Sequence, residues 1–135
     1  MSKDGLIIYK SFGKLYLYEK DNSLALEFNP ILDGVEAGNS NPLHSLVVIP
    51  KQNLPELAVV ATCFLKNWES QDYVYTASDR GKEILIKLYK DKTKGGDEVW
   101  LRIVTGKEEE HRKRIKLTKR DLLALKYVVD LILFK

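Results

Sequence analysis

The sequence predicts an α+β fold in which four short antiparallel strands and one helix occur twice. Residues 44–66 and 112–135 share one pattern when laid over each other, with Ile49 on Leu117 and Lys51 on Lys119. Four short runs of β-forming residues precede each shared helical segment, and short turns join most of them, as in antiparallel sheets. We therefore expect two β-β-β-β-α repeats produced by internal duplication.

The first repeat is expected to span residues 5–68. Its strands are predicted at 6–11, 14–20, 23–29 and 45–49, with turns at Gly13 and at Asp21-Asn22. Residues 33–42 have the composition of a loop or a long hairpin tip. The helix begins at about Asn53, which is a suitable cap, and Pro55 is tolerated in its first turn. Its apolar face consists of Leu54, Leu57, Val60, Ala61, Phe64 and Leu65.

The second repeat is expected to span residues 72–135, with strands at 73–77, 83–90, 98–104 and 114–117. Thr118, followed three residues later by Asp121, is close to a capping box and opens the final helix. The buried stripe of that helix is predicted to be Leu122, Leu125, Val128, Val129, Ile132 and Leu133. We expect the two antiparallel sheets and two helices to share one core, so that residues 1–135 form a single domain.

Charge is distributed unevenly along the chain. The net charge is +3, but residues 1–68 hold six basic and seven acidic groups, while the rest hold 16 basic and 12 acidic groups. This asymmetry favours an anionic partner for the second half. The lone Cys63 lies in an apolar helical pattern, and neither a signal peptide nor a membrane span is expected. We therefore expect a cytoplasmic protein that is associated with the nucleoid.

Alternation along the strands assigns residues to the two faces of each sheet. In the second sheet, apolar residues such as Ile86 and Leu101 point inward, whereas aromatic and basic residues share the other side. Stacking of a base on an aromatic ring contributes about 1–3 kcal/mol, and nearby cations neutralise phosphates. We therefore predict that single-stranded nucleic acid binds to Tyr73, Tyr75, Lys87, Tyr89, Trp100, Arg102, Arg114 and Lys116, with Arg112 contributing from the preceding hairpin tip. A possible secondary set in the first sheet is Lys14, Tyr16, Tyr18 and Lys20.

The first repeat lacks most of these charges. Ala25 and Glu27 stand at the positions that match Trp100 and Arg102. Likewise, Leu46 and Val48 match Arg114 and Lys116. Such a charge-poor and partly apolar face suits a contact with another protein better than a contact with phosphates.

The segment "GKEILIKLYKD…DEVWLRIVTG…RKRIKLTKRDLLALKYVVDLI" resembles the domain of the positive-cofactor-4 transcriptional coactivators. The doubled plan is similar to the plant Whirly proteins and the trypanosome guide-RNA-binding proteins. The resemblance covers about residues 5–135. It implies binding of single-stranded DNA, with RNA as the alternative, a role in transcription regulation or genome maintenance, and oligomers. By position it also implies that nucleic acid is held by Lys82, Lys87, Tyr89, Trp100 and Arg102.

Two rival functions remain open. The fold can serve as a protein-interaction or scaffold module without nucleic acid, or the Glu108–His111 tip can belong to a metal-dependent nuclease. No phosphate-binding glycine loop occurs, and Cys63, His44 and His111 lack metal-ligand spacing. We therefore expect no catalysis, no cofactor and no metal. A homo-oligomer, a dimer or a tetramer, is expected through the apolar C-terminal segment "VVDLILFK".

Overall fold

The computed structural model describes residues 5–10, 13–32, 35–36, 45–79, 82–91, 98–105 and 114–135. The first repeat consists of β1 (Gly5–Lys10), β2 (Gly13–Lys20), β3 (Ser23–Leu32), β4 (Val35–Glu36), β5 (Ser45–Ile49), the 3-10 turn η2 (Lys51–Asn53) and α1 (Leu54–Leu65). The second consists of β6 (Tyr73–Asp79), β7 (Lys82–Asp91), β8 (Glu98–Thr105), β9 (Arg114–Leu117) and α2 (Lys119–Leu133). The predicted α+β fold with two β4α units is confirmed.

One small strand was not expected. β4 pairs with the far end of β3, within the segment predicted to be a loop or hairpin tip. β3 accordingly runs to Leu32, three residues beyond its predicted end at Asn29. The predicted turn between β2 and β3 is confirmed, because Asp21 and Asn22 both have positive φ angles, 51° and 61°. A two-residue turn of this kind matches the twist of the flanking strands.

Both sheets are antiparallel and follow the same order. Four strands of the first sheet run β1-β2-β3-β5, and the second sheet runs β6-β7-β8-β9. The pairing register is also the same, since Leu26 pairs with Val47 as Leu101 pairs with Ile115. The duplication therefore extends from the order of elements to the individual residue pairs.

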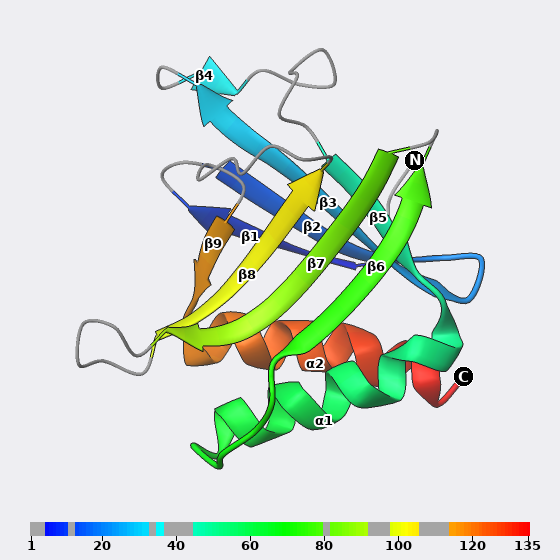
Figure 1. The fold of residues 1–135 in the computed structure, drawn as a ribbon, viewed down its shortest axis with the longest axis vertical. Helices are drawn as coiled ribbons and strands as arrows, with labels where there is room; N and C mark the ends of the chain where they lie inside the picture. Colours follow the sequence, from blue (N-terminus) through cyan, green and yellow to red (C-terminus); the bar gives the residue numbers. More distant parts are fainter. Residues whose placement is uncertain are drawn as a thin grey trace.

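The two helices lie side by side and join the sheets (Figure 1). α2 packs against β1, β2 and β3 of the first repeat and against β9 of its own repeat. α1, from the first repeat, contacts β6 of the second. Residues from both sheets and both helices form one buried cluster, which includes Leu17, Leu54, Leu101 and Val129. Each repeat thus completes the core of the other.

The helices begin in different ways. The Thr118 side chain accepts a hydrogen bond from the Asp121 amide, and the Asp121 carboxylate accepts one from the Thr118 amide. The predicted capping box is therefore present at α2. At α1 the predicted cap was only partly right. Asn53 occupies the N-cap position, but its side chain makes no capping hydrogen bond because the η2 turn already leads the backbone into the helix.

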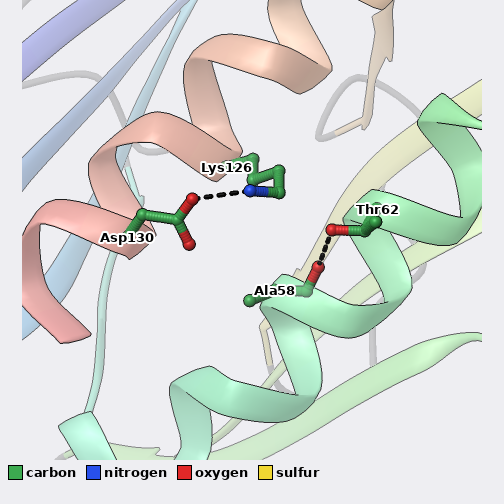
Figure 2. Close-up of polar contacts among 4 residues, drawn as sticks. All are labelled: Ala58, Thr62, Lys126 and Asp130. Atoms are coloured by element: carbon green, nitrogen blue, oxygen red, sulfur yellow. Dashed lines mark hydrogen bonds and ion pairs between the residues drawn. The ribbon is translucent and has the colours of Figure 1, made fainter. Parts of the chain in front are cut away.

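Two of the polar contacts on the helices lie within a single helix. The Thr62 hydroxyl donates to the Ala58 carbonyl at 2.8 Å, and Lys126 pairs with Asp130 at 2.6 Å (Figure 2). Both helices contribute apolar residues, such as Leu57 of α1 and Val129 of α2, to the shared buried cluster. Within the described ranges, neither helix has the length and hydrophobicity of a bilayer span.

Candidate nucleic-acid interface

Two rows of side chains cross the outer face of the second sheet. Alternation buries Ile86, Leu101 and Ile115 on the inner face, so the intervening residues point outward. Direct cross-strand pairing aligns the outward residues into one row of Val74, Lys87, Arg102 and Arg114 and a second row of Tyr89, Trp100 and Lys116. We call six of these residues the basic face: Lys87, Tyr89, Trp100, Arg102, Arg114 and Lys116.

The first row places three cations directly opposite one another. Lys87 pairs with Arg102, and Arg102 pairs with Arg114, on strands about 4.8 Å apart. Like charges in direct cross-strand pairs are destabilising. A row of this kind is therefore typical of a surface that receives an anion rather than of one that only stabilises a sheet.

Cations also lie over the aromatic rings of the basic face. The Arg114 guanidinium carbon is 4.5 Å from the centroid of the Trp100 ring, and Lys87 Nζ is 5.1 Å from that of Tyr89. These contacts hold the charges close to the rings. A base that stacks here contacts either an aromatic ring or the planar guanidinium that covers it, and both surfaces accept bases.

Two carboxylates at the ends of the strands engage the lysines. Lys116 Nζ is 2.9 Å from a Glu98 carboxylate oxygen, and Lys87 Nζ is 3.5 Å from one of Asp72. The hydrogen bond from Lys116 holds the pKa of the Glu98 carboxyl below its usual range. Exposed ion pairs contribute little to stability, so a phosphate can compete for either lysine. The sequence analysis did not identify these two acidic partners.

Tyr73 corrects the predicted site. Its side chain is only 1% exposed, and β6 pairs it with Leu88 of the inner face. The hydroxyl donates to the Asn53 carbonyl at 3.1 Å. Tyr75 lies on the same inner face and packs against the core. Both tyrosines were placed among the binding residues because a tyrosine suits either face of a strand. Burial assigns Tyr73 to the core, and Tyr75 is half-buried against that core.

Two predicted residues fall outside the description of side chains. Lys82 begins β7, but its side chain is not among those described. Arg112 and the whole Glu108–His111 tip lie outside the described residues. The nuclease hypothesis, which depends on that tip, therefore stays a hypothesis. Among the residues that are described, no three His, Cys, Asp or Glu side chains gather closely enough to hold a metal ion.

The first sheet carries different residues at the same register positions. Its equivalent rows are Ile7, Tyr16, Glu27 and Leu46, and Gly5, Tyr18, Ala25 and Val48. Of the secondary candidates, Tyr18 is buried, and its hydroxyl donates to Glu27 at 3.0 Å, so its ring is not an open stacking surface. Lys14 lies 5.2 Å from the Tyr9 ring centroid, Tyr16 is half-buried and Lys20 is exposed. The predicted contrast in charge between the two sheets is present in the structure.

The C-terminal segment proposed for subunit contacts is divided between core and surface. Val128, Val129 and Ile132 are buried, whereas Leu131 and Phe134 are 54% and 83% exposed. An exposed line runs along α2 at four-residue spacing, through Leu123, Tyr127 and Leu131. The oligomeric state itself stays a prediction.

Comparison with known proteins yields a likeness of fold. No protein-family model matches the chain, and no curated protein matches its sequence. Among solved structures, MRP1/MRP2 from Trypanosoma brucei is similar, with a TM-score of 0.55 and 9% identity over 95% of this chain and 81% of that one. At this identity the likeness concerns the fold alone, and it fits the duplicated arrangement of two antiparallel sheets.

Proposed function

We propose that this protein binds single-stranded nucleic acid on the basic face and catalyses no reaction on it. The observation that carries the proposal is the row of three cations formed by Lys87, Arg102 and Arg114 on neighbouring strands. Single strands are held without sequence preference by cations that follow the backbone and by planar groups that stack on bases. The basic face combines both, since Arg114 lies over Trp100 and Lys116 completes the second row.

We also propose a distant relationship to the positive-cofactor-4 and Whirly proteins. The doubled β4α plan, the capping box after Leu117-Thr118-Lys119 and the fold shared with MRP1/MRP2 support it. The outer face of the first sheet has fewer basic residues than that of the second sheet, so the two repeats are not expected to bind nucleic acid equally. In this proposal one repeat binds the strand, while the other completes the core.

The test is fluorescence anisotropy of a labelled oligo-dT of about 30 nucleotides, longer than the roughly 4–16 nucleotides that one small binding domain covers. We expect affinity to fall with salt, with a log–log slope of about −0.7 for each neutralised phosphate, so about −3 if the four cations of the basic face all take part. Arg114→Ala should reduce the slope by about 0.7 and weaken binding. Oligo-rU in parallel compares RNA with DNA.

Lys126→Ala is the matched control, because it removes one positive charge from α2, where Lys126 pairs with Asp130. It should leave affinity and slope unchanged, and a duplex competitor should displace little of the labelled strand. Absence of binding at low salt, or equal effects of Arg114→Ala and Lys126→Ala, would refute the proposal.

A protein-interaction module is the second candidate. The exposed apolar residues of α2, which include Leu123, Tyr127 and Phe134, favour it. The same titration separates the two functions, because a module without nucleic-acid function shows no salt-dependent binding of the strand and tolerates Arg114→Ala.

A further inference from the structure

A groove lies beside the basic face, where α1 ends and α2 begins. Figure 1 shows α1, the start of β6, the β7–β8 ends and the start of α2 converging at this side of the molecule. Two adjoining hollows of about 450 and 390 Å³ occupy it and share Phe64, Asn67 and Lys90 in their linings. The first hollow is also lined by Trp68, Glu69, Ser70 and Asp72, and the second by residues of β8, β9 and the start of α2.

The turn after α1 presents an aromatic ring to solvent. Asn67 has a φ angle of 56°, and the Trp68 amide donates to the Cys63 carbonyl at 2.8 Å, so the chain reverses sharply here. The Trp68 side chain is 57% exposed, which is unusual for so large an apolar group. Lys66 Nζ lies 5.5 Å from the centroid of its ring. The result is an exposed ring that lines the first hollow, with a cation beside the ring.

A second cation lies between the two hollows. Lys90 Nζ donates to the Asn67 side-chain oxygen at 2.9 Å and lies 5.6 Å from the centroid of the Phe64 ring. Both contacts are with uncharged groups, so they position the ammonium without cancelling its charge. The arrangement repeats the chemistry of the basic face, a lysine held beside aromatic rings.

The groove is continuous with the basic face. Lys116 and Glu98 line the second hollow, and Lys116 also belongs to the basic face. Asp72 lines the first hollow and pairs with Lys87 of the basic face at 3.5 Å. Along β7, Tyr89 points to the outer face, whereas the next residue, Lys90, points to the opposite face, where it pairs with Val99. A strand on the basic face therefore reaches the groove by passing the end of the sheet at Lys116, which belongs to both surfaces.

We infer that the groove receives the continuation of a single strand held on the basic face, with one base stacked on Trp68 and a phosphate near Lys90. This inference rests on the proposed function and extends it to a second, consecutive part of the binding site. A binding site made of two consecutive parts predicts that short strands contact the basic face alone. Longer strands reach Trp68 as well.

The two tryptophans of the chain permit a direct test, because Trp68→Phe leaves Trp100 as the reporter and Trp100→Phe leaves Trp68. Each variant is titrated at low salt with oligo-dT of about 4, 8 and 16 nucleotides, within the range of known site sizes. We expect Trp100 fluorescence to be quenched by every length, and Trp68 fluorescence only by the longer strands.

Lys90→Met supplies a second measurement, because its unbranched side chain can still cover the Phe64 ring. It should reduce the salt slope by about 0.7 for the longest strand and leave the slope for the shortest strand unchanged.

Three results would overturn the inference. In the first result, strands of every length quench Trp100 fluorescence but none quenches Trp68 fluorescence. This result excludes the groove from the binding site and leaves the proposed function intact. Quenching of Trp68 by thymidine monophosphate as strong as that by the longest strand assigns the groove to free nucleotides instead. If anisotropy shows no binding of any strand, the proposed function fails and the inference fails with it.

Discussion

At the scale of single residues, the direction of an aromatic side chain decides what it does. Trp100 and Tyr73 both lie in strands of the second sheet, but Trp100 lies on the outer face beneath Arg114, whereas Tyr73 is buried on the inner face. The two are hard to distinguish in sequence because each ring combines a large apolar surface with one polar atom. The hydroxyl of Tyr73 identifies its role, since it donates to the Asn53 carbonyl and ties β6 to the start of α1.

Tyr73→Phe is expected to lower the free energy of unfolding by about 1 kcal/mol, because it removes a partly buried hydrogen bond while keeping the ring. Urea denaturation at neutral pH measures the change. Affinity for single strands should be unaffected, because Tyr73 lies on the inner face. A loss of binding equal to that of Arg114→Ala would contradict the assignment of Tyr73 to the core.

The stability difference between the wild-type protein and Tyr73→Phe is also expected to depend on pH. Burial, with a smaller contribution from Glu56, raises the pKa of Tyr73 well above its ordinary value near 10. Above that pH the folded protein keeps a proton that the unfolded chain has lost. Below about pH 10 the protonation of Tyr73 does not alter the free energy of unfolding. Above about pH 10 the free energy of unfolding falls by up to about 1.4 kcal/mol per pH unit, because the unfolded chain releases the proton and the folded protein does not. The difference in the free energy of unfolding between wild type and Tyr73→Phe should therefore narrow above about pH 10. A difference that stays constant with pH would contradict the raised pKa of Tyr73.

At the scale of elements, sequence patterns predicted the helices and strands closely. Period-two alternation identified eight strands, and the ends of β2 and β5 lie within one residue of the predicted ends. β4 was missed because two residues cannot display an alternation. The helix caps show the limit of motif reading. The reciprocal bonds of Thr118 and Asp121 were expected and are present, whereas Asn53 occupies a capping position without using its side chain.

Thr118→Ala is expected to lower the free energy of unfolding by about 1 kcal/mol, because the Asp121 amide at the start of α2 loses the hydroxyl that accepts its hydrogen bond. Asn53→Ala is the matched variant at α1 and should change the stability by less than about 0.5 kcal/mol. Thr118→Ser keeps the hydroxyl and should restore most of the loss. Equal effects of Thr118→Ala and Asn53→Ala in urea denaturation would show that the capping box contributes nothing.

At the scale of the whole molecule, the helices make the two repeats depend on each other. α2 packs on three strands of the first repeat, so its buried residues Leu125, Val129 and Ile132 lie in a core that both repeats share. Burial of one such side chain contributes about 1.5–3 kcal/mol. A separated second repeat would expose much of this stripe to water.

A chain of residues 72–135 alone is therefore expected to remain largely unfolded, although it contains a complete strand order and helix. The full chain should unfold in a single transition, with coincident curves from circular dichroism and from the fluorescence of Trp68 and Trp100. Two separate transitions, or a folded isolated repeat, would show that the repeats are independent units.

The sequence by itself determined the order of elements, the duplication and the inward or outward direction of most strand residues, because these depend on local periodicity. It also predicted the contrast between Arg102 and Glu27, since equivalent residues occupy the same pairing register in both sheets. Only the tertiary structure decided that Tyr73 and Tyr18 are buried, that each helix contacts the other repeat, and that Trp68 and Lys90 border a groove beside the basic face. These features depend on contacts between segments far apart in the chain, and periodicity within one segment carries no information about what covers it.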